Sequence, residues 1–143
     1  MPVIVVGADT PTGAQIVEAL LEPGREVRVF VSDPAEGTRL RERGAKVALG
    51  DVSDDSHIGA AATQCFSAIL LSEAARDNRE RSFATDEPQV LKAWASGVAG
   101  VRRVIWVHDG EPPPTTAPEV AVVGPDDPDV VNRVVSLDNA AEL

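Results

Sequence analysis

The chain has 143 residues, of which 43% are hydrophobic and 25% charged, a composition typical of one globular domain with a sizeable core. Its formal net charge of −10 argues against nucleic acid or an anionic membrane as a partner, because the average field of the protein repels phosphate. No apolar run approaches the roughly 20 residues that span a membrane, and no basic segment precedes the first apolar stretch, so neither a membrane span nor a signal peptide is expected.

Segments typical of strands and of helices alternate along the chain. Short apolar or β-branched runs predict six strands, at 3–6, 26–31, 46–49, 68–71, 103–107 and 120–123. Helical spacing of apolar residues and helix-capping signals predict five helices, at 12–22, 35–43, 54–65, 88–98 and from Asp127-Pro128 to about Leu137.

Two stretches interrupt this alternation. Residues 73–86 are strongly polar, which predicts either a solvated helix or a mobile loop. Residues 109–118 contain three consecutive prolines, which exclude both a helix and a central strand, so a loop is expected there.

Six apolar strands that alternate with helices predict a single α/β domain over residues 1–143, a doubly wound parallel sheet with helices on both faces. Right-handed crossovers favour the strand order 3-2-1-4-5-6. In that order a ligand lies beyond the carboxyl ends of the strands, at the crevice between the first and fourth. Ser72 and His108 follow two of these strands and are expected at that edge.

The loop after the first strand carries the clearest motif, Gly7-Ala8-Asp9-Thr10-Pro11-Thr12-Gly13. Gly7 permits a tight turn and Gly13 lets the next helix approach the sheet, while the free N–H groups of that helix favour a phosphate. Thr10 stands where a glycine usually lets a diphosphate touch the backbone. Its hydroxyl, or that of Thr12, is a candidate donor to phosphate, and the alternative is a tight turn kept only for packing. The candidate dinucleotide contacts in this loop are Gly7, Asp9, Thr10, Pro11, Thr12 and Gly13.

Four blocks of sequence occur in the order found in one family: the Gly7–Gly13 loop, EVRVFVSDP, KVALGDVSDD and VRRVIWVHDG. On these blocks, residues 3–110 resemble the atypical short-chain dehydrogenase/reductases, and above all the NAD(P)H-binding, NmrA-like group. The resemblance implies a Rossmann fold with NAD or NADP as the ligand.

The resemblance also implies further cofactor contacts. The residues after the second strand choose between NAD and NADP in such proteins, and here they are Ser32 and Asp33. Asp33 is equally well placed to cap the next helix, and Arg39 either reaches a 2′-phosphate or is a solvated helix charge. Asp51 and Val52 match the pair that flanks adenine in the family, although Asp51 also fits a plain turn residue. The choice between NAD and NADP therefore stays open.

The chain departs from the family's chemistry. Catalysis in the larger superfamily uses a tyrosine and a lysine four residues later, but this sequence has no tyrosine. His108, with Asp109 beside it, is a candidate proton donor in place of the tyrosine, or else a structural residue. His57 is expected at the surface. The three arginines at 76, 79 and 81 form either a lid over a bound phosphate or a solvated charged face.

Three classes of function remain from the sequence. The first is a nucleotide-binding or redox-sensing protein, and the second is a small NAD(P)H-dependent reductase. Because members of the resembled family commonly continue past this length, a second subunit of a homo-oligomer would complete the reductase's substrate site. The third is a degenerate Rossmann interaction module. No metal site is predicted, and the single cysteine, Cys65, indicates a reducing, cytoplasmic compartment.

Overall fold

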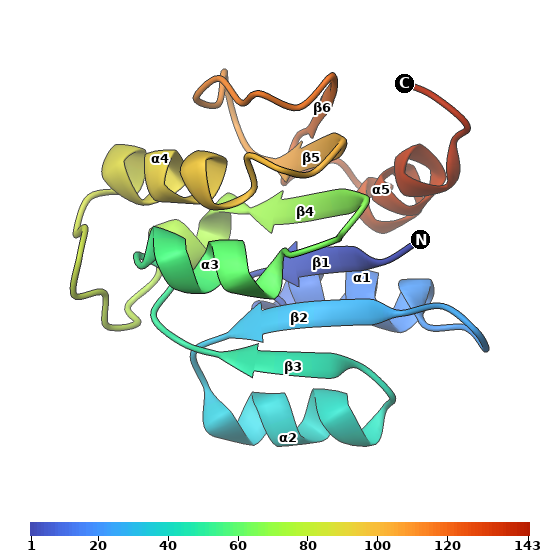
Figure 1. Cartoon of the computed structure of the whole chain (residues 1–143), viewed down its shortest axis with the longest axis horizontal. Helices are drawn as coiled ribbons and strands as arrows, with labels where there is room; N and C mark the ends of the chain where they lie inside the picture. The colour runs from blue at the N-terminus through green and yellow to red at the C-terminus, as the bar shows by residue number, and fades with distance from the viewer.

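A computed structural model describes all 143 residues of the chain. Its sheet has six parallel strands in the order β3-β2-β1-β4-β5-β6, which confirms the predicted doubly wound α/β fold (Figure 1). The elements, in chain order, are β1 (Val3–Val6), α1 (Pro11–Leu20), β2 (Val27–Val31), α2 (Pro34–Glu42), β3 (Lys46–Leu49), α3 (Asp55–Ala61), β4 (Ser67–Leu71), the 3₁₀ helix η1 (Ser72–Ala75), α4 (Glu87–Gly97), β5 (Arg103–Val107), β6 (Glu119–Val123) and α5 (Val130–Asn139).

Helices cover both faces of the sheet. The helices α3 and α4 lie on one face, where Ile58, Val90 and Trp94 enter a core with Ile4 and Leu70. The opposite face packs against α1, α2 and α5, through residues that include Ile16, Val17, Leu40 and Val134. Every residue of β1, β4 and β5 is buried, which explains why these strands are apolar in the sequence apart from Ser67 and Arg103 at their first positions. No helix is both long enough and apolar enough to cross a membrane.

The final helix begins later than the sequence predicts. Asp127 and Pro128 were expected as its cap and first residue, but α5 starts at Val130. The Asp127 carboxylate instead accepts the Asp129 N–H at 2.8 Å, and its carbonyl accepts the Val130 N–H. This turn holds Pro128 outside the helix.

A charged residue at the start of β5 lies entirely inside the fold. Arg103, the first residue of β5, is fully buried. Its guanidinium donates to the carbonyls of Leu137, Asp138 and Ala140 and pairs with Glu119 at 2.7 Å. The residue therefore joins the end of α5 to the start of β5 and β6.

Candidate functional site

The loop between β1 and α1 depends on two glycines. Gly7 has a φ of +91°, in the region that favours glycine. A Cβ atom at Gly13 would lie 2.1 Å from the Gly7 carbonyl oxygen and 2.8 Å from the Thr10 hydroxyl oxygen. The first turn of α1 thus approaches the end of β1 more closely than any side chain at position 13 permits, which is the close approach that the motif predicts.

Thr10 supports this loop from within. Its hydroxyl donates to the Gly7 carbonyl at 2.7 Å and accepts the Gly13 N–H at 3.1 Å, and the residue is buried. The hydroxyl proposed as a donor to phosphate is therefore already used by the loop itself. Pro11, the first residue of α1, has no N–H group, and Thr10 accepts that of Gly13, so among the first three residues of the helix only Thr12 has a free N–H.

The residues after β2 are held by Asp9 and by the next helix. Asp9 Oδ2 accepts the N–H groups of Ser32, at 2.9 Å, and of Asp33, at 3.3 Å. The Asp33 carboxylate accepts the Ala35 N–H at 2.9 Å and so caps α2. Arg39 pairs with Glu36 on an exposed side of α2, at 3.0 Å. Of the alternatives left open by the sequence, the structure places Asp33 in the helix cap and Arg39 in a solvated pair.

Asp51 and Val52 lie at the end of β3 and contact two other segments. Asp51 accepts the Ser53 N–H at 2.8 Å and, from far along the chain, the Ser82 N–H at 2.8 Å. Burial by itself raises the pKa of Asp51, but these hydrogen bonds outweigh it and hold the pKa below the ordinary value. Val52 is buried, and its carbonyl accepts the Trp94 indole N–H at 2.7 Å.

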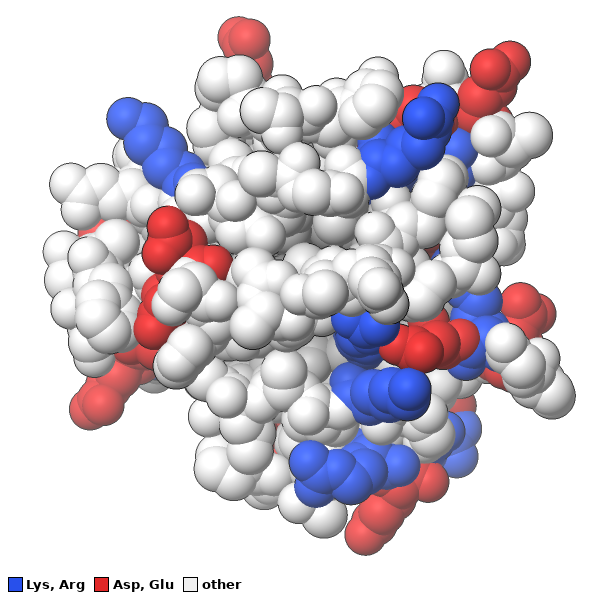
Figure 2. All heavy atoms as spheres, in the orientation of Figure 1, with Lys and Arg blue, Asp and Glu red and all other residues white.

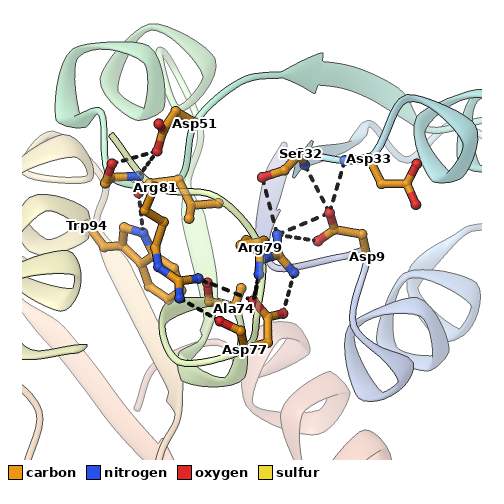
Figure 3. A network of polar contacts seen from close by, with 11 residues as sticks. Asp9, Ser32, Asp33, Asp51, Ala74, Asp77, Arg79, Arg81 and Trp94 are labelled. Atoms are coloured by element: carbon orange, nitrogen blue, oxygen red, sulfur yellow. Dashed lines mark hydrogen bonds and ion pairs between the residues drawn. The ribbon is translucent and has the colours of Figure 1, made fainter. Parts of the chain in front are cut away.

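The polar stretch after η1 folds back over the ends of β2 and β3 (Figure 3). Arg79 Nη1 lies 2.9 Å from Asp9 Oδ1, and Arg79 Nη2 lies 2.8 Å from Asp77 Oδ2. Arg81 donates to the Ala74 carbonyl at 3.0 Å and to Asp77 at 3.2 Å. The side chains of Arg79 and Arg81 are only 11% and 10% exposed, so the expectation of a solvated charged face is wrong for both. The ion pairs compensate for their burial.

The electrostatics of this segment favour the charged form of each partner. Burial lowers the pKa of Arg79, but its hydrogen bond to Asp77 and the charge of Asp9 raise it above its ordinary value. Burial likewise raises the pKa of Asp77, while the hydrogen bonds and charge of Arg79 lower it overall. The ion pair between Asp77 and Arg79 is therefore fully charged at neutral pH.

The crevice at the carboxyl edge of the sheet is divided by this segment. Residues 77–83 cover the ends of β2 and β3, while two cavities of about 250 and 360 Å³ adjoin the ends of β4 and β5. Arg76 and Asp126 line both cavities, and Thr12 lines the smaller one. The Ser72 hydroxyl donates to the Val107 carbonyl at 3.0 Å and accepts from Arg76 at 3.1 Å. Arg76 and Thr12 thus face the smaller cavity together with two acidic residues, Glu73 and Asp126.

His108 follows β5 and lines the larger cavity. Its side chain is 10% exposed, and its Nδ1 atom is buried without a hydrogen-bond partner. Glu87, the first residue of α4, places Oε1 3.8 Å from this nitrogen. The carboxylate beside His108 is therefore that of Glu87, where the sequence suggested Asp109.

Sequence patterns named Arg79 only as one of three arginines in a candidate lid and did not point to Glu87 as a member of the site. Arg79 stands in a run of charged residues, and Glu87 begins an amphipathic helix. The structure brings Asp9, Ser32 and Arg79 together and separates them from His108 and Glu87, which lie at the other end of the crevice. His57 is exposed, as expected.

The fold and this loop define the class of protein. A parallel sheet in the order β3-β2-β1-β4-β5-β6, with a glycine-framed turn between β1 and α1, is a Rossmann-like nucleotide-binding architecture. Residues 7–118 match the family model described as NAD(P)H-binding, and the chain belongs to this family. The match confirms the predicted resemblance to the atypical, NmrA-like dehydrogenase/reductases and gives NAD(P)H as the ligand class.

Several solved structures share the fold. Triphenylmethane reductase of Citrobacter sp. has a TM-score of 0.63 at 19% identity, and the alignment covers 75% of this chain and 37% of that one. The anaerobillin reductase ChuY of Escherichia coli O157:H7 has a TM-score of 0.57 at 22% identity, with 76% and 51% covered. The NADPH-dependent quinone oxidoreductase QOR2 of Escherichia coli has a TM-score of 0.52 at 20% identity, with 73% and 34% covered.

A curated relative is similar in sequence. Photosystem II assembly factor Ycf39 of Guillardia theta is 29% identical over 107 residues, which are 74% of this chain and 34% of that protein. The chain therefore spans from about a third to about half of the length of the relatives that it matches.

Proposed function

We propose that this chain is a nucleotide-binding, redox-sensing protein that reports bound NAD(P)H through the position of residues 77–83. The observation that supports this most directly is the Arg79 guanidinium, which pairs with Asp77 in its own segment and with Asp9 in the loop between β1 and α1. In a doubly wound sheet the adenosine half of a dinucleotide lies over the ends of the second and third strands. Residues 77–83 and the adenosine therefore compete for one place, and binding displaces the segment.

The absence of tyrosine favours binding over the usual dehydrogenase chemistry. The sequence contains no tyrosine, so no phenol is present to transfer a proton beside the nicotinamide. The cavity beside α1 offers Thr12 and the Arg76 guanidinium as candidate contacts for a diphosphate, next to the carboxylates of Glu73 and Asp126. The chain thus keeps residues suited to binding and lacks the superfamily's proton donor.

Limited proteolysis tests the coupling between binding and displacement. Trypsin cleaves after arginine, and the closed segment hides the side chains of Arg79 and Arg81. We expect NADH or NADPH to accelerate cleavage after these two residues, with binding followed in parallel by the nucleotide's fluorescence. Binding without any change in cleavage would contradict the coupling. If neither nucleotide binds, the domain is a degenerate interaction module.

A matched pair of variants isolates the role of Arg79. Arg79→Ala removes the bridge and raises the population of the open segment, so the apparent dissociation constant falls by about tenfold. Arg41→Ala, at an exposed position of α2, removes the same charge away from the crevice and leaves the affinity unchanged. An unchanged affinity in Arg79→Ala would mean that the segment does not compete with the nucleotide.

The contact between His108 and Glu87 favours a second candidate function, an NAD(P)H-dependent reductase. The bound dinucleotide would supply hydride, and His108, which lies 3.8 Å from Glu87, would donate the proton to a quinone or flavin substrate. His108→Gln should then lower turnover at least 100-fold with nucleotide affinity unchanged. Equal turnover in the variant, or none in the native protein, would leave sensing as the function.

The oligomeric state and the cytoplasmic location remain predictions. A second copy that closes the larger cavity would complete a substrate site for the reductase. Light scattering with and without NADH measures whether a dimer forms.

A further inference from the structure

Asp9 belongs to the loop between β1 and α1, but its carboxylate lies at the end of β2. Its Oδ2 atom accepts the N–H groups of Ser32, at 2.9 Å, and of Asp33, at 3.3 Å. The Asp9 side chain is 4% exposed. The two backbone amides that follow β2 therefore already hold a negative group of the protein.

The end of β2 is where a Rossmann fold distinguishes the two dinucleotides. A carboxylate at this place accepts the hydroxyls of the adenosine ribose in NAD, whereas an arginine accommodates the 2′-phosphate of NADP. Asp33 follows β2 directly, but its carboxylate caps α2 through the Ala35 N–H. Asp9 is the residue that supplies a carboxylate to this position.

The two oxygens of Asp9 have different partners. Oδ2 accepts both backbone amides and a weaker contact from Arg79 at 3.1 Å, while Oδ1 accepts only from Arg79, at 2.9 Å. When Arg79 withdraws, the amides still fix the carboxylate through Oδ2. The Oδ1 atom is then free to accept a hydroxyl of the ribose.

A 2′-phosphate would meet a repulsive environment at the same place. The amides that would bind it already hold Asp9, and the nearby Arg39 is paired with Glu36. A phosphate bound to these amides would lie beside the carboxylates of Asp9 and Asp33, and the negative charges would repel one another. In Figure 2 the basic side chains gather over the amino ends of β2 and β3, at the right, while acidic ones prevail at the opposite edge below α4.

We infer that Asp9 selects NAD(H) against NADP(H), with Oδ1 as the acceptor for the ribose hydroxyl. The inference rests on the proposed function, because Asp9 becomes accessible when the nucleotide displaces Arg79. It adds to that function the identity of the dinucleotide and the residue that chooses it.

Dissociation constants for NADH and NADPH test the inference. The native protein should bind NADH at least tenfold more tightly than NADPH. Asp9→Asn keeps the size of the side chain and an oxygen for the two amides but removes the charge, so the ratio of the two constants should fall at least tenfold. Glu42→Gln, at an exposed position of α2, changes the net charge equally and should leave the ratio unchanged.

A second measurement uses only the native protein, in case Asp9→Asn does not fold. ADP and adenosine 2′,5′-bisphosphate carry the adenosine part without and with a 2′-phosphate, and only ADP should raise the melting temperature at equal concentration. A preference for NADPH, equal binding of the two nucleotides, or an unchanged ratio in Asp9→Asn would overturn the inference while the proposed function stands. If neither nucleotide binds to the native protein or to Arg79→Ala, the proposed function fails, and the inference fails with it.

Discussion

Asp9 and Arg79 are 70 positions apart in the sequence, and Arg79 Nη1 lies 2.9 Å from Asp9 Oδ1. Asp9 lies in the loop between β1 and α1, and Arg79 lies in the segment between η1 and α4. Their ion pair therefore holds that segment against the loop after β1. The ion pair links the glycine-framed loop to a segment whose position the family resemblance did not predict. In the function proposed above, the nucleotide breaks this ion pair to reach the end of β2.

Gly13→Ala should both destabilise the fold and abolish nucleotide binding. The added Cβ would lie 2.1 Å from the Gly7 carbonyl oxygen, so backbone must move, at a cost of about 1–3 kcal/mol. Urea denaturation measures this cost, and NADH fluorescence measures the binding. Gly100→Ala is the control because a Cβ there meets no atom within 4 Å. Native stability in Gly13→Ala would refute the close approach of α1 to β1.

Thr10→Val tests whether the hydroxyl of Thr10 serves the loop. The substitution keeps the branched shape but removes the acceptor for the Gly13 N–H and the donor to the Gly7 carbonyl. Loss of this helix cap should lower the free energy of unfolding by about 1–2 kcal/mol. Thr10→Ser keeps both hydrogen bonds and should lose less. A larger loss in Thr10→Ser than in Thr10→Val would assign the role of Thr10 to its methyl group.

Arg103→Met should be among the most destabilising changes in the chain. It leaves the carbonyls of Leu137, Asp138 and Ala140 without their donor and leaves Glu119 without its buried partner, at a cost of about 3–5 kcal/mol. The neighbouring Arg102 is 60% exposed and also pairs with Glu119. Arg102→Met should cost about 0–1 kcal/mol, and chemical denaturation of both variants gives the comparison.

Stability should fall in acid in a way that depends on Asp77. Arg79 holds the pKa of Asp77 below its ordinary value, against the effect of burial, so the folded state binds the proton less readily than the unfolded state. The stabilisation is complete above the ordinary carboxyl pKa of about 4 and is lost as the pH falls through the lower, folded pKa.

Asp77→Asn should therefore be less stable than the native protein at pH 7 by about 1 kcal/mol, and the difference should shrink below about pH 4. Urea denaturation at a series of pH values measures both curves. A difference that stays constant down to pH 3 would show that the charge of Asp77 does not contribute to stability.

Local patterns in the sequence were sufficient for the fold class and for the β1–α1 loop. Continuous apolar runs marked β1, β4 and β5 because both faces of these strands are covered, and the bounds of β3 and β5 agree with the prediction to the residue. Gly7 and Gly13 marked the loop because a positive φ and a close backbone approach both require glycine. Each of these features depends on neighbours within a few positions of the chain.

Only the tertiary structure decided which charged residues are buried and which residues they face. Arg79 belongs to a charge run that resembles a solvated surface, and Arg103 opens an apolar strand, yet each is buried against carboxylates or carbonyls from distant segments. The same holds for His108, whose neighbouring carboxylate comes from Glu87 and not from the adjacent Asp109. Such pairings depend on how the helices and loops pack across the sheet, so the sequence determined the fold and its binding loop, while long-range packing determined the partners of the charges.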